Sequence, residues 1–436
     1  MKRVLGICLI LVLVLLFAGC SKKDPAGGEQ ITITVATSVY VEDPHRRAID
    51  DLLEAYKKVA PNVTVEIYGG GWATYWDNVT TEIMGNNEAD IMQIYPENVA
   101  TYHNLRPGGV FADLKQFMNG QDYVSRLTGQ DMCEFDGQAL ALSNYAWGTT
   151  GLFYRKSILA DSNIDPEKIK TWNDFVAASA ELKKKGVSGM GVITSAHSFV
   201  VSIWARMLAR VVSNGLYFPN GETGPFTADN IQVNSPANLW AARQWQDYMI
   251  KNEYGKSAPD PKDFREYFYN GLAAFCYDGP WFVGMIREYD ASMMDDIGII
   301  PAPAVEYNGT LYQPNPTMYP LVMALSKNCK YPQEAWDFMN WMASAEAQKI
   351  SATSGMIPAS VEYSNSAEYK ADHPQSSLFA EILKTYGPQV ADPFIAQQGE
   401  LSQIMVNAAQ EMFAAGADVK TVLDKAAESC RQVMSR

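Results

Sequence analysis

The sequence lacks the concentrated positive charge that a nucleic-acid-binding surface requires. Its 35 Lys and Arg residues are outnumbered by 49 Asp and Glu residues, the formal net charge is −14, and no long basic stretch is present. Phosphate contacts need clustered basic side chains, so we exclude nucleic acid as a partner. The acidic balance leaves neutral solutes, cations and other proteins as partners and does not separate them.

Cysteine and histidine are scarce, and their spacing excludes the common metal and redox motifs. After the N-terminal region the cysteines lie far apart, at Cys133, Cys276, Cys329 and Cys430, and no CxxC pair occurs. These four could form disulfides in an oxidising compartment, or they could remain buried free thiols. The four histidines are scattered, so their spacing indicates neither a metal site nor a catalytic triad.

Motifs of catalysis and cofactor binding are also missing. The sequence contains no GxSxG, no P-loop, no GxGxxG after a predicted strand and no HExxH. We therefore expect no catalytic residue, no metal and no cofactor. One enzyme class stays open, because the 49 acidic residues offer many carboxylate pairs for glycoside hydrolysis, whose separation is invisible in a sequence.

The N-terminus carries an uncharged apolar run, Val4 to Phe17, preceded by Lys2 and Arg3. These fourteen residues are fewer than the roughly 20 that a membrane span needs, but they match the apolar region of a secretory signal. The end of the run, Phe17-Ala18-Gly19-Cys20, resembles the bacterial lipobox, with Phe17 where leucine is commonest. The resemblance implies that signal 1–19 is removed and Cys20 is acylated; simple secretion is the alternative.

Beyond the signal, residues 20–30 are polar, contain a proline and two glycines, and indicate a flexible tether. The folded body opens with an alternating strand at Ile31–Val35, an amphipathic helix at Arg46–Val59 and a second strand at Val63–Ile67. This βαβ unit, and the alternation of strands and helices after it, predict an α/β fold with an open, mostly parallel sheet. No composition shift divides the body into sequential domains.

Aromatic side chains with polar or glycine neighbours are abundant in the predicted loops, and loops at strand ends are where open α/β sheets bind ligands. The flat faces of Trp and Tyr suit the C–H faces of a sugar ring, while carboxylates accept hydrogen bonds from hydroxyl groups. The candidate ligand-binding residues are Tyr40, Glu42, Trp72, Tyr95, Glu97, Trp147, Asp278, Trp281 and Tyr319. Aromatic residues on helical patterns, such as Tyr75 and Trp336, are expected in the core.

Several short stretches follow one another in a recognisable order. Among them are Ala89-Asp90-Ile91, Gly151-Leu152-Phe153-Tyr154-Arg155-Lys156, Asp278-Gly279-Pro280-Trp281 and Gly355-Met356-Ile357-Pro358. This order, over Ile31 to Arg436, resembles the extracellular solute-binding proteins of ATP-driven importers, specifically the group that includes the maltose-binding protein.

The resemblance implies a two-lobed periplasmic-binding-protein fold of type II, with the ligand held in a cleft between lobes that crossing segments join. It places residues 31–146 with 301–327 in the N-terminal lobe, and 150–297 with 331–436 in the C-terminal lobe.

The resemblance also implies roles for two residues: Glu97 would hold sugar hydroxyl groups and Trp281 would stack on a sugar ring. Two positions depart from the family pattern. Gly148 stands near the place of an acidic cleft residue of the maltose binder, and Pro316–Tyr319 replaces glycines common before the next strand. The resemblance therefore does not identify the sugar.

We accordingly expect a monomeric, lipid-anchored receptor outside the cytoplasm that captures a sugar or oligosaccharide by hinge closure and delivers it to the permease subunits of an ABC importer. One alternative is a cationic solute such as a polyamine, because removal of Lys2 and Arg3 takes the formal charge from −14 to −16. An anchored glycoside hydrolase and a sensory receptor with the same fold are two others.

Overall fold

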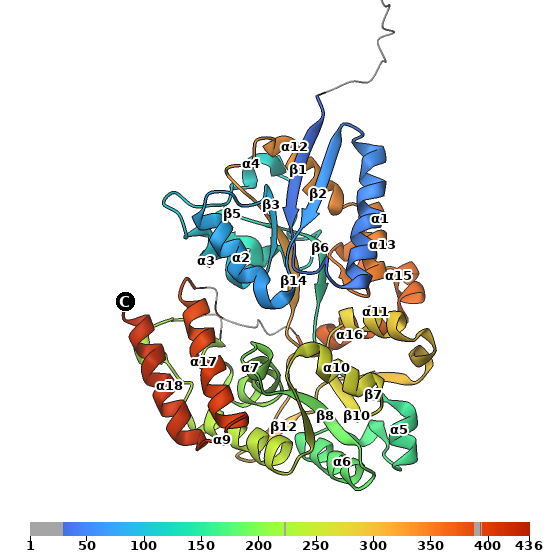
Figure 1. Ribbon diagram of the computed structural model, residues 1–436, viewed down its shortest axis with the longest axis vertical. Helices are drawn as coiled ribbons and strands as arrows, with labels where there is room; N and C mark the ends of the chain where they lie inside the picture. Colours follow the sequence, from blue (N-terminus) through green and yellow to red (C-terminus); the bar gives the residue numbers. More distant parts are fainter. Residues whose placement is uncertain (1–28, 222–223, 388–392, 394) are drawn as a thin grey trace, which may run out of the picture.

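The computed structural model describes residues 29–221, 224–387, 393 and 395–436. The expected signal (1–19), the acylation site Cys20 and the expected tether up to residue 28 lie outside the described residues. The described chain forms two lobes, each built on its own β-sheet with helices packed around it (Figure 1).

The first lobe contains a six-stranded sheet with the order β15-β6-β14-β3-β1-β2. Strands β2, β1 and β3 are parallel, whereas β14 is antiparallel to both of its neighbours and β15 is antiparallel to β6. The strands are β1 (Ile31–Ala36), β2 (Val63–Tyr68), β3 (Ile91–Ile94), β6 (Leu142–Gly148), β14 (Tyr319–Leu325) and β15 (Ile357–Pro358).

Helix α1 (Asp43–Val59) shows how the sequence forms the helices of this lobe. Pro44 occupies its first turn, Lys57 and Lys58 lie in its last turn, and the buried residues, Leu52 among them, recur at helical spacing. The other elements are α2 (Trp72–Met84), α3 (Pro96–His103), α4 (Lys115–Met118), the hairpin β4 (Glu134–Phe135) and β5 (Gln138–Ala139), α12 (Pro332–Met342), α13 (Ala345–Ser351), and the 3-10 turns η1 (Gln130–Cys133) and η8 (Ala352–Ser354).

The second lobe contains a five-stranded sheet with the order β11-β7-β10-β8-β9. Here β10, β8 and β9 are parallel, and β7 is antiparallel to both β10 and β11. The strands are β7 (Gly151–Arg155), β8 (Ser188–Ile193), β9 (Gly255–Ala258), β10 (Ala273–Asp278) and β11 (Ile297–Ile300).

Around the second sheet lie the helices of the lobe and a short β-hairpin. The α-helices are α5 (Lys156–Asp161), α6 (Trp172–Lys184), α7 (Phe199–Trp204), α8 (Arg210–Ser213), α9 (Pro236–Gln244), α10 (Pro261–Tyr269), α11 (Trp281–Tyr289), α16 (Pro374–Tyr386), α17 (Gln398–Phe413) and α18 (Val419–Met434). The hairpin is β12 (Val305–Tyr307) and β13 (Thr310–Tyr312), the π-helical turns are η3 (Ala205–Ala209) and η6 (Trp245–Lys251), and the 3-10 turns are η2 (Pro166–Lys168), η5 (Ala228–Asn230) and η7 (Ala291–Asp295). Helices α14 (Val361–Ser364) and α15 (Ala367–Asp372) follow β15, and their residues Tyr363 and Tyr369 pack in the core of the second lobe.

The predicted α/β class is confirmed, but the expectation of a mostly parallel sheet is wrong, because both sheets are mixed. The antiparallel strands are those next to the crossings between lobes: β6 leads directly into β7, and β14 returns from the second lobe. Strands β14 and β7 enter their lobes from the junction, so they run opposite to neighbours that end at the junction, such as β3 and β10.

The expected boundaries between the lobes are wrong at two segments. Helices α12 and α13 pack in the first lobe, where Trp336 and Phe338 share a core with Ile33 and Leu52, and β15 pairs with β6 (Figure 1). Residues 331–358 therefore do not belong to the second lobe, although they fall in the expected range 331–436.

The range 301–327 divides in a similar way. Strand β14 lies in the first sheet, but Val305 of the preceding hairpin packs in the core of the second lobe, and Ala304 forms a bridge with Thr171. Both lobes have the same α/β composition, which is why no change in composition marks these crossings.

Two other open points are decided by burial. All four described cysteines, Cys133, Cys276, Cys329 and Cys430, are buried and free, so the disulfide alternative is wrong. Tyr75 is in the core as expected: it is buried, and its hydroxyl group donates to the carbonyl oxygens of Ala36 and Gln93.

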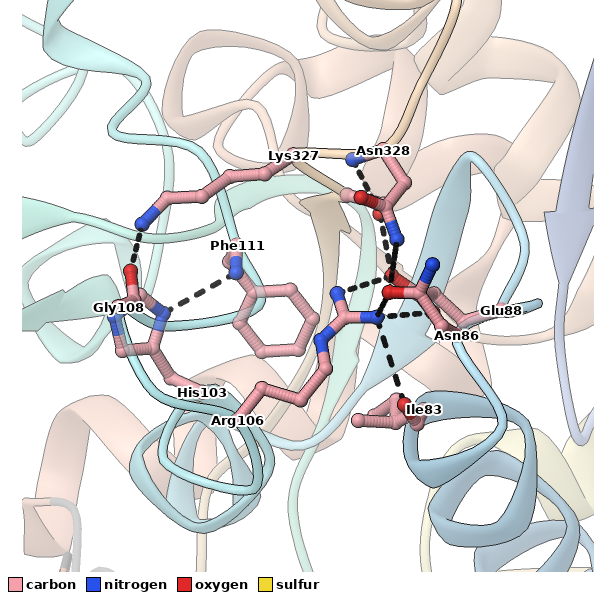
Figure 2. A network of polar contacts seen from close by, with 10 residues as sticks. Ile83, Asn86, Glu88, His103, Arg106, Gly108, Phe111, Lys327 and Asn328 are labelled. Carbon is pink, nitrogen blue, oxygen red and sulfur yellow. Dashed lines mark hydrogen bonds and ion pairs between the residues drawn. The ribbon is translucent and has the colours of Figure 1, made fainter.

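A buried ion pair ties three segments of the first lobe together (Figure 2). The fully buried carboxylate of Glu88 accepts two hydrogen bonds from the Arg106 guanidinium, at 2.6 and 2.9 Å, and further ones from Ser326 and Asn328. Arg106 also donates to the side chain of Asn86 at 2.6 Å. The network fixes the turn after α2 against the ends of α3 and β14, so it stabilises the frame from which the loops at the junction extend.

Candidate functional site

The lobes meet where the carboxyl ends of several strands face one another. Tyr95 follows β3 in the first lobe, Asp278 ends β10 in the second, and Tyr319 begins β14 as the chain returns. Ligands of open α/β sheets bind at the carboxyl ends of parallel strands, so this junction is the place to look for a site.

Four aromatic rings form a continuous row across the junction. Trp76 stacks on Tyr95 with 5.4 Å between ring centroids, Tyr95 lies 6.0 Å from Tyr319, and Tyr319 lies 6.0 Å from Trp281 in an edge-to-face arrangement. Trp76, Tyr95 and Tyr319 belong to the first lobe, and Trp281 begins α11 of the second. The row therefore joins both lobes through side chains.

Two glycines make room for the ring of Trp281. A Cβ atom at Gly148 would lie 2.5 Å from Trp281 Cζ3, and one at Gly279 would lie 2.3 Å from the same atom. Because real Cβ contacts are not this short, any side chain at either position would displace the indole. Gly148, which departs from the family pattern, is therefore required by the ring that packs on it.

A second group at the junction is a chain of alternating charges. Arg265 on α10 binds Asp278 at 2.8 Å and lies 4.0 Å from Glu42, the residue before α1 of the first lobe. Burial opposes the charged form of Arg265, but the two carboxylates outweigh it and raise the pKa of the guanidinium above its usual value. Asp278 also accepts from the amide of Gly279 at 2.9 Å, so its carboxylate is committed to protein partners.

His45, in the first turn of α1, shows how dry this part of the junction is. Its Nδ1 lies 3.0 Å from the hydroxyl group of Tyr145. Burial, with the charge of Arg265, lowers the pKa of His45 to about 3, so the imidazole is neutral at physiological pH. A desolvated junction strengthens every polar contact made there, since water does not screen it.

The remaining candidates lie at different places. Glu97 is in the first turn of α3, and its charge adds to the burial that raises the pKa of Tyr95 and of Tyr319. Tyr40 donates from its hydroxyl group to Asp50 at 2.7 Å on the surface of the first lobe. Trp147 is buried in β6, and its Nε1 donates to the carbonyl of Pro358 at 3.0 Å.

The structure thus brings Glu42, Tyr95, Glu97, Asp278, Trp281 and Tyr319 together at the junction. It places Tyr40 outside the aromatic row and Trp147 in the core. Trp72 begins α2, and its side chain lies outside what the structure describes.

The sequence interpretation missed Arg206, which enters the junction from the second lobe. Its guanidinium lies 4.7 Å from the ring centroid of Tyr319, and it belongs to the π-helical turn η3 that continues α7. Short π-helical turns inside helices occur frequently at functional sites. A signal was available, because Arg206 and Arg210 interrupt the otherwise apolar run Phe199–Val212, and charges in a buried helix need a reason.

The described residues offer neither a cluster of metal ligands nor a helix suited to cross a membrane. No group of three or more His, Cys, Asp or Glu side chains lies close enough to hold a metal ion within ranges 29–221, 224–387 and 395–436. Among the helices of these same ranges, none combines the length and the apolar character needed to cross a membrane.

Comparison with known proteins identifies the family. Residues 42–349 match the sequence pattern of the family described as bacterial extracellular solute-binding protein. The chain belongs to this family. It is also 24% identical, over 69% of its length, to the arabinooligosaccharide-binding protein of Bacillus subtilis (strain 168), of which the match covers 67%.

Solved structures of two sugar receptors have the same fold. The GacH receptor of Streptomyces glaucescens GLA.O, solved unliganded and with acarbose, superposes with a TM-score of 0.79 at 15% identity, over 94% of this chain and 99% of that one. Maltose-bound T. maritima MalE3 superposes with a TM-score of 0.77 at 16% identity, over 92% and 100%. The expected two-lobed fold of the periplasmic solute-binding proteins is thereby confirmed.

Proposed function

We propose that this solute-binding protein captures a sugar or oligosaccharide between its lobes and delivers it to the permease subunits of an ABC importer. The observation that carries the proposal is the row Trp76, Tyr95, Tyr319 and Trp281, which crosses the junction. Flat aromatic faces stack on sugar rings, and Glu97 beside the row supplies an acceptor for hydroxyl groups. The named relatives support the ligand class, since their names specify arabinooligosaccharides, acarbose and maltose.

Capture works by hinge closure. Contacts from both lobes exist together in the closed state, so a ligand that makes both shifts the population toward closure. The lobes of this structure already touch through protein groups: Glu42 faces Arg265, Arg47 pairs with Glu288, and α17 contacts α3. The Arg47–Glu288 pair is largely exposed and therefore screened by salt, so it adds little to closure.

The protein acts as a monomeric receptor without catalysis or a cofactor. The alternative of a cationic ligand is disfavoured by Arg206, which places a positive charge on the aromatic row. A hydrolase would release sugar from an oligosaccharide without any permease, and a sensory receptor would use the same closure with a different partner.

A thermal-shift screen tests the function. We expect a mono- or oligosaccharide to raise the unfolding temperature, because a ligand at a hundred times its Kd stabilises the native state by about 2.7 kcal/mol. Polyamines and amino acids serve as control ligands in the same plate. Stabilisation by a polyamine with none by any carbohydrate would contradict the proposal, and release of free sugar by the purified protein would favour the hydrolase.

We further propose that acylated Cys20 holds the receptor on the outer face of the membrane, supported by the lipobox-like sequence Phe17-Ala18-Gly19-Cys20. The variant Cys20→Ala should move the protein from the membrane fraction to the soluble extracytoplasmic fraction, because the acyl chain has no other attachment point. Cys329→Ala, at a buried cysteine of the folded body, is the matched control and should stay with the membrane. Equal membrane retention of both variants would refute the anchor.

A further inference from the structure

Several of the buried polar atoms without hydrogen-bond partners lie on the segments that meet at the junction. Within the described part of the chain, Thr149 Oγ1, Ser202 Oγ, Arg206 Nε, Thr317 Oγ1 and Tyr319 Oη each lack a partner. Thr149 and Thr317 have no exposed surface, and Tyr319 is 9% exposed. Native proteins satisfy the great majority of buried polar atoms, so each of these unpartnered atoms calls for a reason.

Contacts link Thr317, Tyr319 and Arg206 with Thr150 and Tyr277 in one cluster at the crossing segments. The hydroxyl group of Thr150, next to Thr149, accepts from the amide of Thr317 at 3.2 Å and from the hydroxyl group of Tyr277 at 2.8 Å. Two residues beyond Thr317, the ring of Tyr319 lies under the guanidinium of Arg206. The cluster therefore adjoins the aromatic row at its centre.

Charge decides which ligand group would fit the cluster. Arg206 makes no ion pair within 4 Å among the described residues, while Glu42 and Asp278 are both engaged by Arg265. The positive charge of Arg206 lies over the ring of Tyr319, and it acts against the burial that raises the pKa of Tyr95 and Tyr319. Glu97 is the acidic residue on the first-lobe side, and Arg210 adds a second positive charge near Tyr319.

The kinds of donor in the cluster also indicate which acceptor group would fit them. A guanidinium presents parallel N–H groups that match the two oxygens of a carboxylate or phosphate, and hydroxyl groups of Tyr and Thr donate to the remaining lone pairs. An anion can accept from several donors, so it suits the unpartnered Nε of Arg206 and the unpartnered hydroxyl groups of Tyr319 and Thr317. A single neutral hydroxyl group of a sugar accepts at two lone pairs at most, so it leaves at least one of the three donors without a partner.

We propose that Arg206, Tyr319 and Thr317 form a subsite for an anionic group of the ligand, so that the solute is an acidic carbohydrate carrying a carboxylate or a phosphate. This inference rests on the proposed function, because it adds a charge to the sugar that the aromatic row holds. The net acidity of the whole protein does not oppose it, since surface charges beyond about 8 to 10 Å are screened at physiological salt.

Calorimetry with matched acidic and neutral sugars tests the subsite. The pairs are trigalacturonate with neutral galactotriose, and glucose 6-phosphate with glucose, so that one arm reports a carboxylate and the other a phosphate. In the native protein we expect an acidic member to bind at least about tenfold more tightly than its neutral counterpart. The arm that shows the preference identifies the anion.

Variants of the arginine separate recognition from folding. Arg206→Gln should weaken binding of the acidic sugar by about tenfold to a hundredfold and leave the affinity for the neutral sugar unchanged. The substitution removes only the positive charge and the parallel N–H donors of the guanidinium. Arg206→Lys should restore part of the affinity. Arg243→Gln, at an exposed arginine of α9 in the same lobe, is the matched control and should change neither affinity.

The outcomes separate failure of the anion subsite from failure of the proposed function. Binding of neutral sugars with no preference for acidic ones overturns the subsite and leaves the proposed function standing. An equal loss of both sugars in Arg206→Gln shows a structural role and also overturns the subsite. If no carbohydrate of either kind binds, the proposed function fails, and the subsite fails with it. Should Arg206→Gln not fold, the preference measured on the native protein decides alone.

Discussion

Replacing Trp281 with alanine is expected to weaken carbohydrate binding by about thirtyfold, since truncating a central aromatic anchor costs on the order of 2 kcal/mol. Trp281 is the contribution of the second lobe to the aromatic row, at 6.0 Å from Tyr319. Without it, the closed state loses a ring that both lobes pack against, and the ligand loses a stacking face. Isothermal titration calorimetry with the sugar found in the thermal-shift screen measures the change.

The matched control is Trp240→Ala. Trp240 is also partly buried in the second lobe, but its ring packs on Tyr307 at 5.1 Å, against the hairpin β12–β13. This variant should bind the sugar as the native protein does. Trp281→Tyr keeps a flat ring and should retain most of the affinity. Unchanged binding in Trp281→Ala, or an equal loss in Trp240→Ala, would remove Trp281 from the site.

The place of Trp281 at the junction between the lobes could be predicted because its surroundings are local in sequence. It follows the buried strand Ala273–Asp278 through Gly279 and Pro280, and strand ends of α/β proteins carry ligand contacts. Periodicity likewise placed the first strands correctly, and it found the end of α1 at Val59, although α1 begins three residues before the predicted start at Arg46 because Pro44 fits the first helical turn.

The two arginines in the run Phe199–Val212 stand out in the sequence, but the contact of Arg206 with the aromatic row could not be predicted from it. Its position depends on a π-helical turn, which shifts side chains away from the regular helical spacing, and on Tyr319, 113 residues further along the chain. The pairing of Glu42 with Arg265 across the lobes is similarly distant in sequence. Contacts of this kind depend on how the crossings fold, and no local pattern encodes them.

Trp147 shows the opposite error, where a local pattern suggested exposure. A tryptophan beside glycine predicts a loop residue, but β6 extends through Gly148, and the strand is buried along its whole length. The indole Nε1 finds its partner at Pro358 on β15, a strand of two residues that pattern reading cannot detect. Because β15 pairs with β6 of the first sheet, it also accounts for part of the difference between the expected and the observed second lobe at residues 331–358.

Removing the charge of Glu88 is expected to cost the first lobe about 3 kcal/mol of its unfolding free energy, the scale found when one partner of a buried ion pair is lost. In Glu88→Gln the amide nitrogen would face the guanidinium of Arg106, so two donors meet where a carboxylate now accepts (Figure 2). Ser326 and Asn328 lose a charged acceptor as well. Urea unfolding followed by circular dichroism measures the loss.

The control for this variant is Glu134→Gln, which removes a carboxylate of the same lobe that pairs with Lys115 at 3.4 Å with both side chains 46% exposed. Exposed pairs contribute about 0 to 1 kcal/mol, so this control should shift the unfolding midpoint little. Sugar affinity of the Glu88→Gln protein should stay close to native below its transition, because the network supports the frame and does not reach the junction. Equal midpoints for the two variants would show that the buried pair contributes no more than a surface pair, and a selective loss of sugar binding would assign Glu88 to the site instead of the frame.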